Sequence, residues 1–511
     1  MDHSLSREAP ALISETAAPL GRSLPLEITC SLGIFALVVV LAWLPRLLWG
    51  FWTDETATWW MASHGWREAI ARTITWNGQS ILYSVIESFF RSDSPQREMI
   101  LRLPSAAAIV VAGVLLYRLA ERLISQGAGM LAVVAFCCAP ATVEAATNAR
   151  PYALALAAAL FSYSKFLDWI ESGTVSNWVV YVAAGMLVIY LHYLFAFFLL
   201  IQFFVLVWRW KQHLQARWMG AAAAACVWGL SLIPLRDQLA PMLHGSKDFA
   251  GAVPPTFGQL LILCFPPQIL IAAALSGALI VVRYPESLRI PAKLASDRIF
   301  LLITWAFLGP LLFFAAARLT GTCIFATRYL LFASPAVFLL LAWAASGLKL
   351  RLRILIAVAI FGATTLSIGG LRQSFRPAAA DWRAPLARLA QLSQDHRAPV
   401  FMASPFNNAN WRDWRAGNTP RSYLFAPLDV YPVNNPVLPL PYFVDAKAQH
   451  FASETIRDRL KNQRFYLIAN KDSEFAQDFP GTIDSIGFQH QQEAVNDYLI
   501  FSFRPAGEAL Q

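Results

Sequence analysis

Two adjacent acidic residues directly follow the first long apolar segment of the chain. The sequence there reads Phe51-Trp52-Thr53-Asp54-Glu55-Thr56. Carboxylates in this position lie at the depth of lipid headgroups, where they can meet an interfacial substrate. Partial burial raises the pKa of a carboxylate toward the range of a general base, whereas a nearby cation lowers it. Asp54 and Glu55 therefore predict acid–base chemistry at a membrane surface.

The same residues also fit the start of a helix. Thr53 or Asp54 suits the N-cap, and the helix dipole would stabilise Glu55 in an amphipathic helix that continues through Trp66. The local sequence leaves this alternative open.

Five cationic side chains stand at the ends of apolar segments on the same expected face as these acids. They are Arg102, Arg150, His192, Arg318 and Arg328. A charge in the bilayer centre costs about 2.5–3.5 kcal/mol on insertion scales, so such residues face water, a partner or an anionic ligand. The guanidinium group suits a lipid phosphate because it donates two parallel hydrogen bonds and stays charged. Snorkelling, or pairing with Glu144 and Asp54, is the alternative for each residue taken singly.

The elements that would hold these residues are apolar helices. The 511-residue chain is 57% hydrophobic and 14% charged, with a mean hydropathy of +0.47, so the bilayer must be its main solvent. We expect eleven spans, near 28–49, 99–119, 127–143, 151–167, 178–190, 193–208, 218–235, 257–282, 299–317, 329–347 and 354–371. The two spans on either side of His192 are short and could form one tilted helix.

Charge sets the expected orientation. With a cytoplasmic N-terminus, the basic loops all face the cytoplasm, which explains the net charge of +9 without a nucleic-acid partner. Their residues are Arg118, Arg122, Lys165, Arg209, Lys211, Arg217, Arg283, Arg289, Lys293, Arg298, Lys349, Arg351 and Arg353. The loops 50–98, 144–150, 236–256 and 318–328 and the turn at His192 then build the outer face.

The chain divides into three parts. Residues 1–27 are expected to be a disordered cytoplasmic tail, 28–371 a polytopic α-helical membrane domain with 51–98 as its first outer loop, and 372–511 a soluble domain outside. Strand-like runs at 399–403, 465–469 and 498–503, with helix-like segments at 381–394 and 454–462, predict a small α/β fold for that domain. All six cysteines fall in or beside apolar runs, which argues against a disulfide framework or a cysteine metal site.

Several short motifs recur in the same order in one superfamily. They are Thr53-Asp54-Glu55-Thr56, Arg102-Leu103-Pro104-Ser105, Asn148-Ala149-Arg150-Pro151-Tyr152, Leu191-His192-Tyr193 and Arg328-Tyr329-Leu330-Leu331. The chain resembles a GT-C glycosyltransferase, and more narrowly the bacterial branch related to protein O-mannosyltransferases and lipid A aminoarabinose transferases. The likeness covers essentially all of 28–371, and a following domain that opens with Asp381-Trp382-Arg383 also fits that branch.

The resemblance implies an inverting glycosyltransferase with a sugar on polyprenyl phosphate as donor, acting on the outer face of the cytoplasmic (inner) membrane. It maps the catalytic Asp onto Asp54, with Glu55 as the supporting acid. Residues that would hold the departing phosphate are Arg150, His192, Arg328 and Arg318. Residues expected to line the substrate are Trp59, Trp76, Tyr83, Arg102, Tyr152 and Tyr193. For the tryptophans and tyrosines of the first loop, interfacial anchoring is the alternative role.

One departure concerns the later part of the first loop. Relatives often carry a His-Pro-Pro-Leu-like stretch where this chain has Asn77-Gly78-Gln79-Ser80-Ile81-Leu82-Tyr83. The resemblance therefore leaves the acceptor and the metal requirement open. No cofactor is required by the sequence, although Asp54 and Glu87 could supply oxygen ligands to a divalent cation.

Two other classes of function compete with the enzyme. A transporter or flippase for a lipid-linked sugar would place ionisable groups near mid-membrane on broken helices, whereas Asp54 and Glu55 follow a complete span. A non-catalytic scaffold gives no reason for acids and cations to share one face. The sugar, and whether the acceptor is a protein, a lipid or a glycan, depend on pocket shape and not on these motifs.

Overall fold

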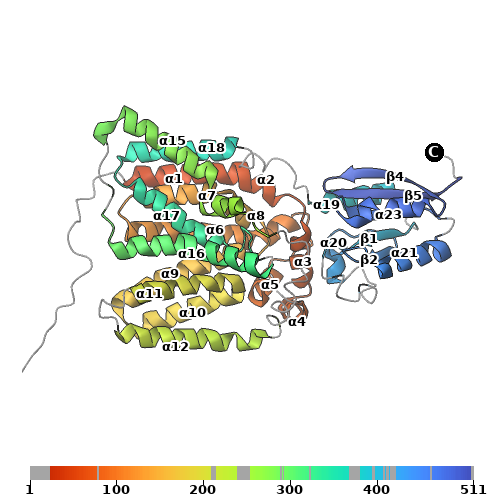
Figure 1. Cartoon of the computed structure of the whole chain (residues 1–511), viewed down its shortest axis with the longest axis horizontal. Helices are drawn as coiled ribbons and strands as arrows, with labels where there is room; N and C mark the ends of the chain where they lie inside the picture. Colours follow the sequence, from red (N-terminus) through yellow and green to blue (C-terminus); the bar gives the residue numbers. More distant parts are fainter. Residues whose placement is uncertain are drawn as a thin grey trace, which may run out of the picture.

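A computed structural model gives the arrangement of the chain. It describes residues 24–76, 80–208, 215–236, 238, 254–287, 291, 293–321, 324–367, 380–393, 398–406, 409, 414, 422–460 and 463–507. A long bundle of apolar helices forms one end of the molecule and a small sheet with its own helices forms the other (Figure 1). Three short helices, α3 (Thr53–Met61), α4 (Trp66–Thr75) and α5 (Ile81–Ser88), lie between them. Most of the expected tail, 1–27, lies outside the described residues.

The bundle is built from the apolar segments expected to cross the membrane. Its helices are α1 (Leu24–Val38), α2 (Leu44–Leu47), α6 (Arg97–Leu123), α7 (Gly129–Cys138), α8 (Pro140–Thr147), α9 (Tyr152–Ser172), α10 (Val175–Leu191), α11 (Phe197–Trp208), α12 (Gln215–Ser231), α14 (Phe257–Cys264), α15 (Pro267–Arg283), α16 (Ser296–Thr320), α17 (Ser334–Ala344) and α18 (Leu350–Leu366). A π-helical segment, Val39–Trp43, joins α1 to α2.

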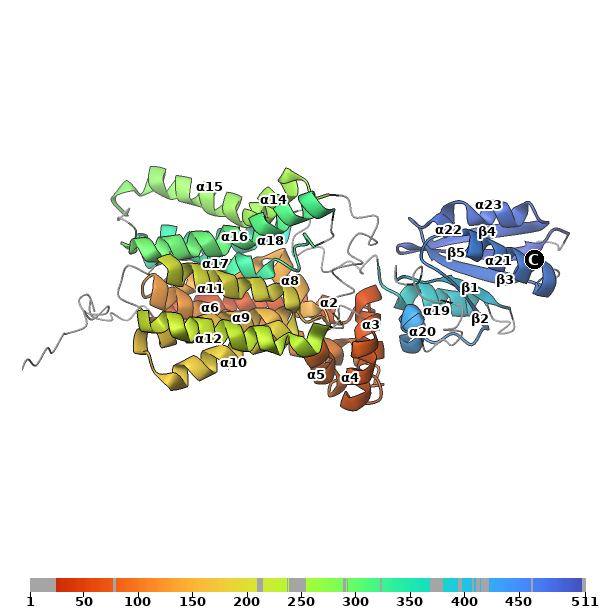
Figure 2. The same cartoon turned by 60° about the horizontal axis from the view of Figure 1, so that its bottom comes forward.

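Each of the eleven expected spans coincides with one or two of these helices. Five helices are long and apolar enough to cross a membrane singly, and the described residues give up to seven spans when the bent pairs α7–α8 (69°) and α14–α15 (57°) are counted. The protein is therefore a multi-pass membrane protein, with fewer spans by length and composition than the eleven expected. His192 stands at a break between α10 and the segment leading into α11, and both helices cross the bundle between the same two ends (Figure 2).

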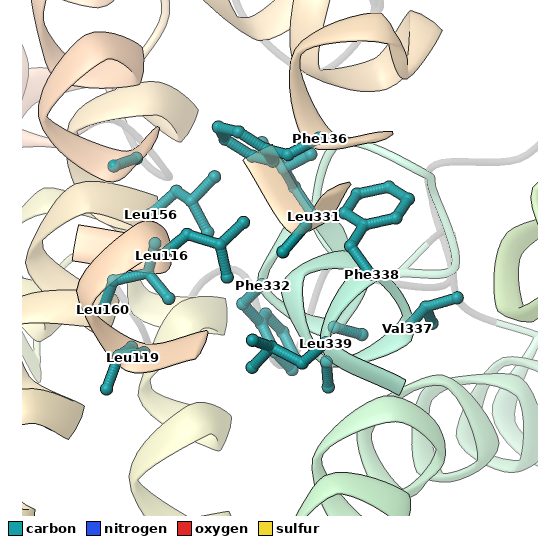
Figure 3. Packing of buried hydrophobic residues seen from close by; sticks show 14 of the residues in the cluster. Leu116, Leu119, Phe136, Leu156, Leu160, Leu331, Phe332, Val337, Phe338 and Leu339 are labelled. Atoms are coloured by element: carbon teal, nitrogen blue, oxygen red, sulfur yellow. The ribbon is translucent and has the colours of Figure 1, made fainter. Parts of the chain in front are cut away.

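The centre of the bundle is packed by leucine and phenylalanine side chains from α6, α7, α9 and the start of α17. Figure 3 shows this packing, in which Leu116, Phe136, Leu156 and Phe332 are fully buried. Small residues allow close helix contacts elsewhere. A Cβ atom added at Gly185 would lie 2.4 Å from the Trp228 ring, for example. Close packing therefore holds the helix ends, and the charged residues on them, in fixed relative positions.

The first outer loop folds into three helices, α3 (Thr53–Met61), α4 (Trp66–Thr75) and α5 (Ile81–Ser88). The alternative of one helix running through Trp66 is wrong, because α3 ends at Met61. His64 (φ 65°) and Gly65 (φ 85°) have left-handed backbones that break the chain there. Both views place these helices at the end of the bundle that faces the sheet (Figures 1 and 2).

The C-terminal domain contains a five-stranded sheet in the order β2-β1-β3-β5-β4. The strands are β1 (Val400–Ala403), β2 (Val437–Leu440), β3 (Phe465–Asn470), β4 (Phe488–Val495) and β5 (Tyr498–Pro505). β1 pairs in parallel with β2 and β3, whereas β5 is antiparallel to β3 and β4. Its helices are α19 (Arg383–Leu392), α20 (Ala426–Val430), α21 (Ala446–Arg459), α22 (Glu474–Gln477) and α23 (Phe479–Asp484). The expected strands coincide with β1, β3 and β5.

Candidate active site

Helix α3 brings the two adjacent acids to the outer end of the bundle. Its N-cap is Trp52, one residue before the Thr53 or Asp54 expected, and Glu55 stands at the third helical position. The Glu55 carboxylate accepts a hydrogen bond from the Trp52 backbone N–H at 3.3 Å, which satisfies one of the free donors at the helix start. The helix start considered as the alternative is therefore present, and the Glu55 side chain helps to cap it.

Glu55 is completely buried in an ion pair with Arg102. The Arg102 guanidinium donates to both carboxylate oxygens, at 2.7 and 2.5 Å, and the backbone N–H of Ala149 donates to the Glu55 Oε1 atom at 2.7 Å. Arg102 also donates to the carbonyl oxygens of residues 46, 47, 49 and 50. Both carboxylate oxygens of Glu55 and the guanidinium nitrogens of Arg102 have hydrogen-bond partners inside the protein. The pair therefore joins α3 to α6 and exposes no surface to a substrate.

Asp54 has a different environment. Its carboxylate is 28% exposed, and its Oδ2 atom lies 3.9 Å from a guanidinium nitrogen of Arg150 and 3.9 Å from one of Arg328. These distances are those of ion pairs and are too long for hydrogen bonds. Arg150 instead donates to the backbone carbonyl of Asp54 at 3.2 Å and is only 11% exposed. The Asp54 carboxylate therefore has two cations nearby, but neither of them forms a hydrogen bond with it.

Aromatic rings and an imidazole complete this group. Tyr152 lies 5.1 Å from the His192 ring and 6.0 Å from Tyr329, measured between ring centroids. The Arg328 guanidinium lies over Tyr329 at 5.3 Å and over Trp52 at 5.7 Å. We name Asp54, Arg150, His192, Tyr152, Arg328 and Tyr329 the open cluster. It unites one acid and three of the four phosphate-binding residues predicted from the sequence.

The open cluster has an excess of positive charge. Burial, followed by the charges of Arg150 and Arg328, lowers the pKa of His192 to about 3, so its ring is neutral. Two guanidinium groups then face one carboxylate, which leaves one positive charge in excess. The Nε atoms of both arginines and the Nδ1 atom of His192 are buried with no hydrogen-bond partner among the described residues. An anion with several oxygen atoms would correct both the charge and the missing hydrogen bonds.

An apolar cavity of about 490 Å³ is lined in part by Thr327 and Leu330, the residues directly before and after Arg328 and Tyr329 of the open cluster. Its lining comes from α8, the bend between α14 and α15, the segment around Thr327, and α17, and includes Pro140, Leu263, Pro267, Thr327, Leu331 and Phe338. Because Thr327 directly precedes Arg328, an apolar chain in this cavity would have its polar end near a guanidinium group.

The remaining predicted site residues lie elsewhere. Trp59, Trp76, Tyr83 and Arg102 are each less than 10% exposed and serve packing contacts, and Tyr193 hydrogen-bonds Gln238 through its hydroxyl. Arg318 is exposed near the end of α16 and, within the described part of the chain, does not contact the open cluster. The structure therefore places the first four residues in buried packing contacts, and only Tyr152 among the predicted lining residues joins the open cluster. Substrate contact by the other lining residues stays a prediction.

A divalent-cation site receives no support from the described residues. They contain no group of three or more His, Cys, Asp or Glu side chains that could hold a metal ion. The Asp54 carboxylate faces two guanidinium groups, which repel a dication. Glu87 is buried beside Tyr83, and its burial raises its pKa well above the usual value, which favours the neutral acid.

Sequence reasoning missed three aromatic residues near the site. Trp52 directly precedes the Thr53–Thr56 motif and Tyr329 lies within the Arg328–Leu331 motif, so their proximity to Arg328 could have been anticipated. Tyr423 comes from the C-terminal domain, where its ring stacks on Trp76 with centroids 4.0 Å apart. Nothing in the local sequence of Tyr423 marks it, because its position depends on how the two domains meet.

Comparisons with known proteins agree with the resemblance seen in the sequence. The family model described as dolichyl-phosphate-mannose-protein mannosyltransferase matches residues 87–233. The comparison with curated proteins gave no match.

Solved structures share the fold over nearly the whole chain. ArnT from Cupriavidus metallidurans in the apo state is 13% identical, with a TM-score of 0.56, and 94% of this chain and 97% of that chain are covered. The crystal structure of the same protein bound to undecaprenyl phosphate is 12% identical, with a TM-score of 0.56 and coverage of 94% and 98%. At this level of identity, the structural match shows a common fold.

Proposed function

We propose that this chain, whose predicted resemblance to the GT-C glycosyltransferases is confirmed by the family model and the shared fold, is an inverting glycosyltransferase with a polyprenyl-phosphate sugar as donor. The open cluster carries the proposal, because it sets two under-paired guanidinium groups beside one accessible carboxylate at the end of an apolar bundle. A phosphate would meet Arg150, His192 and Arg328, and Asp54 would meet the acceptor hydroxyl.

The proposed reaction is one displacement. The acceptor oxygen attacks the anomeric carbon, the bond from that carbon to the phosphate oxygen breaks, and polyprenyl phosphate leaves with the bonding electrons. Asp54 accepts the proton of the acceptor hydroxyl. The two guanidinium groups stabilise the charge that develops on the leaving phosphate. Glu55 is committed to Arg102, so the site offers one free carboxylate, which suits inversion in a single step and gives no second carboxylate to act as a nucleophile.

A lipid-linked donor fits the surroundings of the open cluster. The apolar cavity beside Thr327 would take the first prenyl units while the phosphate meets Arg328. The ArnT structure with undecaprenyl phosphate shows that a protein of this fold binds such a lipid. We place the open cluster and the C-terminal domain on the outer face of the inner membrane, since the basic loop residues Arg122, Arg298 and Arg353 lie at the opposite end of the helices.

The transporter alternative is less well supported. The bends in the two bent helix pairs contain Ala139 and Phe265 with prolines beside them, and no ionisable residue. The ionisable groups instead gather at the ends of the helices, where an interfacial reaction needs them.

Transfer by the purified protein tests the proposal. The protein in detergent or nanodiscs is given membrane extract as acceptor and the same radiolabelled sugar either on polyprenyl phosphate or on a nucleotide. We expect label transfer and release of polyprenyl phosphate only with the lipid-linked donor, and a product whose anomeric configuration is inverted. Transfer from the nucleotide sugar alone, or retention of configuration, would refute the mechanism.

A further inference from the structure

The backbone that leads into the catalytic helix is held by the C-terminal domain. Trp382 donates its backbone N–H to the carbonyl of Phe51 at 3.1 Å and its indole N–H to the Thr53 hydroxyl at 3.1 Å. Asp381 accepts a hydrogen bond from the backbone N–H of Gly50 at 3.1 Å. These contacts join residues more than 300 positions apart in the sequence to the residues directly before Asp54.

Tyr431 adds a second connection from the same domain. Its hydroxyl accepts a hydrogen bond from the backbone N–H of Phe51 at 2.8 Å and donates to the Glu98 carboxylate at 2.8 Å. Arg383 pairs with Glu98 at 2.7 Å and donates to the carbonyl of Leu48 at 3.2 Å. Residues 48–53 therefore have their backbone groups fixed by one domain while Arg102 fixes their other side.

Gly50 shows how closely the two parts meet. A Cβ atom at this position would lie 1.8 Å from the Asp381 carboxylate and 2.7 Å from the Arg383 side chain. Only glycine allows this approach. Trp382 is itself 1% exposed and packs on Tyr498, so the segment that grips the backbone is rigid within its own domain.

We propose that the C-terminal domain orients the catalytic base, with Trp382, Asp381 and Tyr431 as positioning residues that fix residues 50–53 and hence the direction of the Asp54 side chain. The proposal rests on the proposed function. It follows from the order of the chain: Thr53 is the first residue of α3 and Asp54 the second, so a hydrogen bond to Thr53 fixes the start of the helix on which the base stands. An error of about 1 Å in such a position can cost roughly a hundred-fold in rate.

Two substitutions remove the Trp382–Thr53 hydrogen bond. Trp382→Phe keeps an aromatic ring but loses the indole N–H, and Thr53→Val keeps the branched side chain but loses the hydroxyl. We expect each to lower kcat of the folded protein by about ten-fold to a hundred-fold, with the donor KM nearly unchanged. The thermal midpoint should stay near that of the wild type in Thr53→Val and fall in Trp382→Phe, because the smaller ring leaves a gap in the buried contact with Tyr498. The Thr53 hydroxyl also hydrogen-bonds Tyr498, so the double variant should lose no more than Thr53→Val, which already removes both bonds.

The matched control is Arg388→Gln. Arg388 stands on α19, close in sequence to Trp382, but its ion pair with Glu493 lies within the C-terminal domain. This variant should keep the wild-type kcat. Wild-type kcat in Trp382→Phe and Thr53→Val would overturn the proposal, and so would losses that match only a loss of folded protein.

Hydrogen exchange separates failure of this proposal from failure of the proposed function. In the full-length chain, the backbone amides of residues 50–56 should exchange faster in Trp382→Phe than in the wild type and in Arg388→Gln. Faster exchange supports the positioning role even if the wild type shows no transfer from a lipid-linked sugar. Unchanged exchange together with unchanged kcat would end it.

Discussion

Asp54 and Glu55 are neighbours in the sequence, yet they belong to two different regions of the molecule. Successive residues of an α-helix point about 100° apart, so the first turn of α3 sends one carboxylate into the interior and the other toward the open cluster. Glu55 is 0% exposed and hydrogen-bonded to Arg102, whereas Asp54 is 28% exposed and stands 3.9 Å from its nearest cations.

The difference shows how to separate structural charge from functional charge. In the Glu55–Arg102 region the charges balance and the hydrogen bonds are complete, so the pair holds elements together. In the open cluster the positive charge is in excess and several buried N–H groups lack partners among the described residues. Both regions contain the same types of side chain, arginines and a carboxylate. Completeness of pairing, rather than residue type, indicates where a ligand binds.

The largest expected effect on kcat comes from removing the carboxylate of the open cluster. Asp54→Asn should lower kcat by about a hundred-fold to ten-thousand-fold, because it removes the proton acceptor. The thermal midpoint should stay close to that of the wild type, since no hydrogen bond holds this side chain strongly. Transfer of radiolabelled sugar from polyprenyl phosphate measures the first quantity and thermal unfolding the second. Undiminished transfer would remove Asp54 from the mechanism.

The next largest effect is expected when the buried Glu55–Arg102 pair is broken. Glu55→Gln leaves the buried Arg102 charge without a counter-charge and replaces one of its two carboxylate acceptors with a donor amide, so we expect a loss of about 3–5 kcal/mol in the free energy of unfolding. A lower thermal midpoint and less folded protein in detergent would report it. A variant with wild-type stability and no transfer would contradict the comparison, because it would make Glu55 a catalytic residue.

A smaller effect concerns donor binding. Arg328→Ala should weaken binding of the polyprenyl-phosphate sugar by about ten-fold or more, since it removes charge-assisted hydrogen bonds to the phosphate. Arg318→Ala is the matched control, because this arginine is exposed and stands outside the open cluster. Donor KM in the two variants is the measurement. Equal weakening in both, or weakening in Arg318→Ala alone, would move the phosphate site.

The smallest effect comes from a third carboxylate, Glu87, which is buried without a paired cation among the described residues. Burial raises its pKa well above the usual 4.5, so above that pH the folded state holds a proton that the unfolded state has lost. Stability should therefore fall as the pH rises until the folded carboxyl also ionises. Glu87→Gln should flatten the dependence of the thermal midpoint on pH above about pH 4.5. An unchanged slope would show that other groups cause it.

Local patterns predicted the parts of the fold that depend on local physics. Apolar runs predicted the helices of the bundle, because long apolar segments can satisfy their backbone in a bilayer only as helices. The strand-like runs coincide with β1, β3 and β5, because short apolar runs rich in β-branched and aromatic residues favour buried strands. The number of spans stays a prediction, since several of the expected spans coincide with apolar helices of only 10–17 residues, such as Val175–Leu191 and Leu331–Ala344.

The sequence by itself determined that this protein works in a membrane and that Asp54, Arg150, His192 and Arg328 stand at the ends of apolar segments. Only the tertiary structure decided that the Glu55 carboxylate is paired with Arg102 and that Trp382 holds the segment before Asp54. The reason is physical. Hydropathy is a property of neighbouring residues, whereas the pairing of a charge depends on which distant side chains and carbonyl groups the fold brings within about 3 Å of it.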